Sequence, residues 1–167
     1  MGWRSSFLQN RRESLMPITY CTGDIFDNHY KAQALAHGCN CQGVMGAGIA
    51  IRFKTKYPAM FLEYRRRCRV SPRLFNLGDA FLWVEEGAPF VFNLGTQEYI
   101  GANATYPAVG KSLTSMRSQL FANSLTSVAI PKIGCGIGGL NWERVKGLIE
   151  DVFKDTTLDI YVYDKYR

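Results

Sequence analysis

The chain has 167 residues, of which 47% are hydrophobic and 20% charged, with a net charge of +6. This length suits one domain with a substantial core, and the composition excludes a globally disordered chain. The positive charge suits an anionic partner such as a nucleotide, a nucleic acid or an anionic lipid, without choosing among them. No apolar run approaches the roughly 20 residues that span a bilayer, and we expect no membrane partner.

Cysteine and histidine usage argues against a metal site. The chain has five cysteines and two histidines, and no two cysteines form a C-x-x-C pair. An odd count without that spacing predicts neither a disulfide framework nor a structural zinc site. We therefore expect no metal, no cofactor and reduced thiols, in a protein of the cytoplasm or of a eukaryotic nucleus. The residues concerned are Cys21, Cys39, Cys41, Cys68, Cys135, His29 and His37.

The first 15 residues differ in composition from the rest. Arg4, Arg11 and Arg12 stand among small polar residues with few large apolar side chains. Organellar targeting peptides are normally longer, so we interpret residues 1–15 as an N-terminal extension that is disordered or vector-derived. A single, monomeric domain is expected over residues 16–167.

Strand-like runs and helical periodicities alternate through the remaining sequence. Short β-rich runs predict strands at 18–21, 32–39, 79–84, 89–94, 127–133 and 159–163, the third and fourth forming a hairpin. Helices are expected at 49–57, from Pro58 through Cys68, at 106–123 and after Asn141. This order favours an α/β fold with helices on both faces of a mixed, mostly parallel sheet of about six strands.

Apolar stripes predict which helix faces are buried. In the 106–123 helix the residues expected to face the core are Leu113, Met116, Leu120 and Phe121. In the last helix, for which Asn141 is a good N-cap, they are Trp142, Val145, Ile149 and Val152.

The helix that starts at Pro58 also carries a basic cluster, made of Arg65, Arg66, Arg67 and Arg69. We interpret this cluster as a solvated face, because no aromatic residues are interleaved to stack on bases. Nucleic-acid binding remains a weaker alternative.

The stretch from Asn40 to Ala50 follows a predicted strand and enters a predicted helix. Its glycines, Gly43, Gly46 and Gly48, let backbone N–H groups approach a ligand, and a helix start favours an anion. The spacing fits neither the dinucleotide-binding fingerprint nor the P-loop. Taken alone, the stretch predicts a generic phosphate site.

A second glycine cluster, residues 134–139, also follows a strand and precedes a helix. In a parallel sheet both clusters emerge at the same edge, together with Asp24 and the polar loop 95–103. Two facing glycine loops can hold a diphosphate through backbone N–H groups with few lysines. Asp24 can accept hydrogen bonds from a ligand amine or from its own turn.

Three segments together resemble the macro domain: HGCNCQG at residues 37–43, MGAGIA at 45–50 and PKIGCGIGGLNW at 131–142. The likeness covers about residues 17–164. It is closest to the branch that contains terminal ADP-ribose protein glycohydrolase, bacterial DNA ADP-ribosyl glycohydrolases and yeast-type ADP-ribose 1″-phosphate phosphatase. The resemblance implies a three-layer α/β/α fold with an ADP-ribose cleft.

The resemblance also implies a set of ligand-binding residues. Asp24 would accept from the adenine amine, with Ile25 and Tyr163 beside the base. The loop 134–139 would hold the diphosphate, and Asn40 with residues 46–49 would surround the distal ribose. The full set is Asp24, Ile25, Asn40, Met45, Gly46, Ala47, Gly48, Ile49, Pro131, Gly134, Cys135, Gly136, Ile137, Gly138 and Tyr163.

The chemistry differs from that of the relatives that cleave through a lysine–ADP-ribose adduct. The resemblance places Gln97 where those relatives have the lysine and Gly138 where they have an acidic residue. An amide cannot form an imine, and no other lysine is obviously positioned to replace it. We therefore expect a water-based hydrolysis of ADP-ribosyl esters on acidic protein residues, with Asn40 and Gln97 orienting ribose, water or leaving group.

Three alternatives remain open. His37 matches a histidine implicated in the 1″-phosphate phosphatases and could act as nucleophile or general acid on a phosphate ester. The chain could instead be a non-catalytic reader of ADP-ribose. The third alternative is DNA or RNA binding, which would depend steeply on salt. The expected partner is ADP-ribose or an ADP-ribosylated protein.

Overall fold

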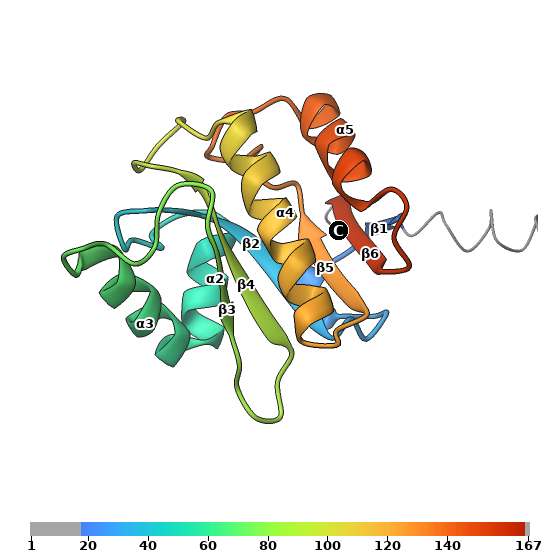
Figure 1. Ribbon diagram of the computed structural model, residues 1–167, viewed down its shortest axis with the longest axis horizontal. Coiled ribbons are helices and arrows are strands. Elements are labelled where there is room, and N and C mark those ends of the chain that lie inside the picture. Colours follow the sequence, from blue (N-terminus) through green and yellow to red (C-terminus); the bar gives the residue numbers. More distant parts are fainter. Residues whose placement is uncertain (1–17, 166–167) are drawn as a thin grey trace, which may run out of the picture.

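The computed structural model describes residues 18–165; the expected N-terminal extension, residues 1–15, lies outside this range. The strands are β1 (Ile18–Thr22), β2 (Ala34–Asn40), β3 (Ala80–Trp83), β4 (Phe90–Gln97), β5 (Ser127–Pro131) and β6 (Asp159–Lys165). The helices are α2 (Ile49–Lys56), α3 (Pro58–Arg69), α4 (Tyr106–Ala122) and α5 (Trp142–Phe153), and η1 (Ile25–Asp27) is a short 3-10 turn. The six strands and four helices expected from the sequence are confirmed (Figure 1).

One six-stranded sheet runs through the molecule in the order β1-β6-β5-β2-β4-β3. The pairings β1–β6, β5–β6, β2–β5 and β2–β4 are parallel, and β3 pairs antiparallel with β4 as the hairpin predicted. Five strands therefore end at the same edge of the sheet. The loops that follow β1, β5, β2 and β4 meet there in that order across the edge.

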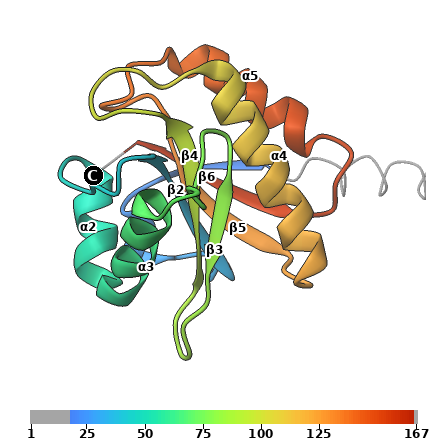
Figure 2. The same ribbon diagram turned by 60° about the vertical axis from the view of Figure 1, so that its left-hand side comes forward.

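The two faces of the sheet are covered by different helix pairs. Helices α2 and α3 lie on one face and α4 and α5 on the other (Figure 2). Alternate strand residues divide between the two cores, so that Leu35 and Cys39 of β2 pack with α2 and α3. Ala34 and Ala36 of the same strand pack with α4 and α5. This alternation is the period-two pattern of a strand buried on both faces.

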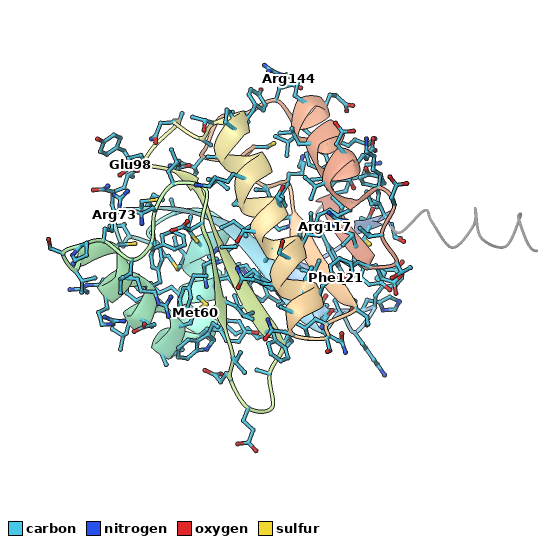
Figure 3. All side chains as sticks on the ribbon, viewed as in Figure 1. Met60, Arg73, Glu98, Arg117, Phe121 and Arg144 are labelled. Carbon is cyan, nitrogen blue, oxygen red and sulfur yellow. The ribbon has the colours of Figure 1, made fainter. Side chains whose placement is uncertain are left out.

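The prediction that Phe121 faces the core is wrong. Leu113, Met116 and Leu120 of α4 are buried, but Phe121 is 50% exposed (Figure 3). Successive helical residues are rotated by about 100°, so Leu120 and Phe121 cannot both face the sheet. In α5, Val145 and Ile149 are buried, Trp142 and Val152 are only half-buried, and the buried Phe153 completes the stripe.

The basic cluster of α3 lies on an exposed or half-exposed helix face. Arg66 and Arg67 both form ion pairs with Glu63, at 2.8 and 2.9 Å. Pairs of this kind, three and four residues apart, are typical of a solvated helix face and contribute little to stability. Among residues 18–165, no cluster of three or more His, Cys, Asp or Glu side chains suits a metal ion, and no helix is long and apolar enough to cross a membrane.

Candidate functional site

A cleft of about 590 Å³ opens at the sheet edge where the parallel strands end. Both glycine clusters contribute to its walls, as the sequence predicts. Ten predicted site residues line it: Ala47, Gly48, Ile49, Gln97, Pro131, Gly134, Cys135, Gly136, Ile137 and Gly138. The predicted residues that do not are Asp24, Ile25, His37, Asn40, Met45, Gly46 and Tyr163.

The second glycine loop presents a row of unused backbone donors. The N–H groups of Cys135, Gly139 and Leu140 donate to carbonyls of the same loop, which fixes its shape. Within the part of the chain that the structure describes, the N–H groups of residues 136–138 have no acceptor. Consecutive free N–H groups in a tight loop form a concave anion site.

The first glycine loop ends in a helix start without a side-chain cap. Gly48, the N-cap of α2, has φ 59° and ψ −147°, a conformation that glycine adopts readily. Among residues 18–165 no side chain caps these first-turn N–H groups, which are therefore available at the positive end of the helix dipole. A Cβ on Gly48 would lie 3.5 Å from Ile137 Cδ1, so the two glycine loops meet across the cleft.

The side chain of Asn40 forms hydrogen bonds with the backbone of the first glycine loop. Its Nδ2 donates to the Val44 carbonyl at 2.8 Å, and its Oδ1 accepts from the N–H of Gln42 at 3.0 Å. The Tyr64 hydroxyl lies 2.7 Å from the Asn40 carbonyl and 2.9 Å from Oδ1. These contacts turn the amide toward the loop, and the direct ribose contact expected for Asn40 remains a prediction. We interpret Asn40 as a positioning residue, together with the buried Met45.

Gln97 lines the cleft and fixes the loop that follows β4. Its Nε2 donates to the carbonyls of Tyr99 and Gly101, at 2.6 and 2.7 Å. The rest of that loop is held by Asn103 and by a bidentate ion pair between Arg73 and Glu98 (Figure 3). With its N–H groups used internally, Gln97 retains Oε1 as the atom for a water or a sugar hydroxyl.

His37 lies in the core, which weighs against the catalytic role that the phosphatase alternative gives it. The side chain has no exposed surface, and its ring stacks on Phe53 with centroids 3.9 Å apart. Nε2 donates to Oδ1 of Asn93 at 2.7 Å, because the Asn93 amide nitrogen already donates to the Phe81 carbonyl. Burial lowers the pKa of His37 to about 4, so the ring is neutral at physiological pH. A group without access to the cleft cannot attack or protonate a substrate there.

The low pKa of His37 predicts a pH-dependent stability. The folded protein holds the ring neutral, whereas the unfolded chain takes up a proton near pH 6.5. The contribution of His37 to the free energy of unfolding is therefore fully present above pH 6.5. It is lost as pH falls from 6.5 to about 4, by about 3 kcal/mol. Urea unfolding between pH 7 and 4 should show this slope, and His37→Gln should flatten it. The exposed His29→Gln is the matched variant and should retain it; an unchanged slope in His37→Gln would contradict the assignment.

Asp24, in the turn after β1, forms an ion pair with Arg52. Both oxygens of Asp24 accept from Arg52, at 3.1 and 2.5 Å, and Oδ1 also accepts from the Phe26 N–H. The Arg52 guanidinium holds the pKa of this carboxyl below its usual range. Ile25 and Tyr163 belong to the core on the α2 and α3 face, and the buried Tyr163 hydroxyl has no partner among residues 18–165. The base contacts expected for Asp24, Ile25 and Tyr163 remain predictions.

Gly138 leaves no room for a side chain. A Cβ there would lie 2.6 Å from the Gly134 carbonyl oxygen and 2.7 Å from Ala104 Cβ, both closer than real Cβ contacts. The loop is thus closed against any side chain at position 138, including the acidic one that a lysine-dependent route would need there.

Six lining residues were not expected from the sequence: Gly38, Ala50, Arg52, Thr96, Lys132 and Ile133. Thr96 and Lys132 directly flank predicted site residues at strand ends, and Arg52 stands four residues after Gly48, one helical turn on, so position alone could have indicated them. Lys132 brings one lysine to the wall of the cleft, beside the second glycine loop.

The comparisons agree with this architecture. Residues 36–149 match the family model of the macro domain. The human ADP-ribose glycohydrolase OARD1 is 35% identical over 146 residues, which cover 87% of this chain and 90% of that protein. The DNA ADP-ribosyl glycohydrolase of Mycobacterium tuberculosis is 30% identical over 87% of this chain, which spans only 42% of that protein. The solved macrodomain of Mycobacterium tuberculosis DarG superposes with a TM-score of 0.79 at 31% identity, over 87% of this chain and 96% of that one. The chain belongs to the macro domain family.

Proposed function

We propose that this protein binds ADP-ribose and hydrolyses its ester bond to acidic residues of ADP-ribosylated proteins. The observation that carries the proposal is the pair of backbone donor sets facing one cleft. The free N–H groups of residues 136–138 lie on one side and the uncapped start of α2 on the other. A diphosphate fits such a site, and relatives with ADP-ribose glycohydrolase activity support the ligand.

The bond broken is the one between the anomeric carbon of the distal ribose and the modified carboxylate. A water attacks the anomeric carbon, the carboxylate leaves with the bonding electron pair, and the proton of the water passes to the diphosphate. A carboxylate is a stable leaving group, so the reaction needs little acid assistance. This requirement suits a cleft to which the described residues contribute no carboxyl side chain.

The same geometry weighs against the phosphatase alternative, because the His37 side chain extends from β2 into the core and has no exposed surface. It also bears on the covalent route. Lys132 lines the cleft, yet it lies between Pro131 and Ile133 at the end of β5, beside the anion-binding loop rather than at the position of Gln97. We expect borohydride reduction during turnover to trap no adduct; a trapped adduct on Lys132 would replace the water route.

The decisive experiment compares three substrates with one enzyme preparation: ADP-ribosylated glutamate in a protein, ADP-ribosylated DNA and ADP-ribose 1″-phosphate. Release of ADP-ribose from the first, faster than from the other two, supports the proposal. Calorimetry with free ADP-ribose separates the remaining outcomes. Binding without turnover of any substrate would identify a reader, and absence of binding would reject the proposed function altogether.

A further inference from the structure

Two arginines of the basic cluster on α3 differ from their neighbours. Arg66 and Arg67 are paired with Glu63. Arg65 and Arg69, in contrast, have no carboxylate partner among residues 18–165. Both are exposed and stand four residues apart, so they lie on the same side of the helix. This side of α3 therefore carries two positive charges that no acidic side chain of the described residues neutralises.

The arginine pair lies against the first glycine loop. A Cβ on Gly43 would lie 3.2 Å from Arg69 Nε and 3.3 Å from Arg65 Cα. Arg69 Nε is also 3.5 Å from the Gln42 carbonyl oxygen. These contacts place the two arginines beside the loop that leads from β2 into the cleft.

Gln42 connects this surface to the loop that follows β4. Its Nε2 donates to the Glu98 carbonyl at 3.1 Å, and the Cys41 N–H donates to the same carbonyl at 3.2 Å. Glu98 directly follows Gln97, which lines the cleft and donates to the Tyr99 carbonyl at 2.6 Å. The surface that begins at the arginine pair therefore continues to the part of the cleft that Gln97 lines.

Two large apolar side chains complete this surface. Tyr99 and Ile100 are 63% and 62% exposed. Asn103 fixes their backbone, because its Oδ1 accepts from the Tyr99 N–H at 2.9 Å and its Nδ2 donates to both carbonyls, at 2.9 and 3.1 Å. Exposed side chains on a backbone held in this way form a contact surface that is ordered before a partner binds. We call Arg65, Arg69, Tyr99 and Ile100 the distal rim.

The acidic side chains on the two segments of the distal rim, α3 and residues 98–103, are already ion-paired. Glu98 forms a bidentate ion pair with Arg73 (Figure 3), and Glu63 is held by arginines of α3 itself. The unpaired charge that remains is that of Arg65 and Arg69. Guanidinium groups bind carboxylates through two parallel hydrogen bonds, so the rim is complementary to acidic side chains.

We propose that the distal rim binds the polypeptide around the modified residue and favours substrates in which acidic residues flank the ADP-ribosylated glutamate. The inference rests on the proposed function, in which the leaving carboxylate lies near Gln97. A glutamate bound there is still part of a polypeptide, whose neighbouring residues must lie outside the cleft. An extended chain spans about 3.5 Å per residue, so three or four flanking residues cover roughly 10–14 Å of the adjoining surface.

A polypeptide suits the distal rim better than a nucleic acid does. Half of the rim is apolar, and a polypeptide offers carboxylates and apolar side chains together. Two unpaired arginines also supply fewer phosphate contacts than a DNA-binding surface normally makes.

Two peptides of equal length, each with one ADP-ribosylated glutamate, test this role. Aspartates flank the glutamate in one peptide and serines in the other. At low salt the wild type should release ADP-ribose from the aspartate peptide with about tenfold higher kcat/KM, through a lower KM, and salt should reduce this preference. Arg65→Ala combined with Arg69→Ala should raise KM for the aspartate peptide to that for the serine peptide, without a fall in kcat. Tyr99→Ser combined with Ile100→Ser should raise KM for both peptides by about threefold.

Arg66→Ala combined with Lys154→Ala is the matched control. It removes two positive charges outside the rim, one on α3 and one at the end of α5, each from a residue in an ion pair. This variant should keep the preference for the aspartate peptide. Equal losses in the two charge-removing variants would reduce the effect to net charge and overturn the inference.

Three further outcomes would also overturn the inference. A wild type that cleaves both peptides equally well would do so while leaving the proposed function intact. A larger loss on ADP-ribosylated DNA than on the aspartate peptide, in the Arg65→Ala and Arg69→Ala variant, would assign the rim to nucleic acid. Absence of release from either peptide by the wild type would reject the proposed function and the inference together.

Discussion

Replacement of Gln97 by glutamate is expected to lower kcat/KM for release of glutamate-linked ADP-ribose by at least about a hundredfold. The substitution keeps the shape of the side chain and removes both N–H donors. Two carbonyl oxygens, those of Tyr99 and Gly101, then face a buried carboxylate at 2.6 and 2.7 Å. These two hydrogen bonds are part-buried, and unpaired acceptors cost up to about 1–3 kcal/mol each where they are buried, so residues 98–103 should leave their position beside Gln97.

Gln42→Glu provides the control for this experiment. Gln42 Nε2 donates to a single carbonyl, that of Glu98, at 3.1 Å, and Gln42 does not line the cleft. The same chemical change there should reduce kcat/KM by less than about tenfold.

Hydrogen–deuterium exchange at residues 98–103 separates two roles for Gln97. Lost turnover with faster exchange identifies a residue that positions the loop. If turnover is lost while exchange stays at the wild-type rate, Gln97 acts on the water or leaving group through Oε1. Full turnover with a protected loop would contradict both. Lowering the pH should partly restore the glutamate variant, because protonation returns one donor.

The architecture can be predicted from the sequence because the patterns that specify strands, helices and turns lie within short segments of the chain. Strand runs and helix stripes recur at their proper periods, and the two glycine clusters stand where strands end. Parallel strand ends share an edge, so these loops could be brought into one cleft without coordinates. The Asn141 cap of α5 follows the same logic, with its side chain accepting from the Arg144 N–H.

The polar side chains of the site could not be predicted in the same way, since each has several possible partners. Asn40 bonds to its own loop instead of facing the cleft, and His37 lies between Phe53 and Asn93, which are distant in sequence. Arg52 reaches Asp24 across 28 residues. A sequence motif specifies the residue type at such a position. Only the tertiary packing determines which hydrogen bonds the side chain of that residue makes.

Gly138→Ala is expected to weaken ADP-ribose binding by about a hundredfold and to lower the free energy of unfolding by about 2 kcal/mol. The added Cβ would overlap the Gly134 carbonyl oxygen and Ala104 Cβ, at 2.6 and 2.7 Å. Because the loop has to open to accept it, the free N–H groups of residues 136–138 lose their common direction. Gly136→Ala is the stability control, since its Cβ would meet nothing within 4 Å. Urea unfolding and calorimetry measure the two effects, and a Gly138→Ala protein as stable and as tight-binding as the wild type would refute this loop geometry.

The same contact predicts that the lysine-dependent chemistry cannot be installed by two substitutions. Gln97→Lys with Gly138→Glu supplies both residue types, but the glutamate would begin from a Cβ that the Gly134 carbonyl excludes. Adding Ala104→Gly removes only the side-chain half of the overlap, because the Gly134 oxygen belongs to the backbone. We therefore expect neither combination to yield a borohydride-trapped adduct, although Gln97→Lys alone can still donate to the Tyr99 and Gly101 carbonyls. An adduct in the double variant would show that the second glycine loop moves during turnover. The closed loop at Gly138, as much as the glutamine at position 97, thus argues against a covalent lysine route in this protein.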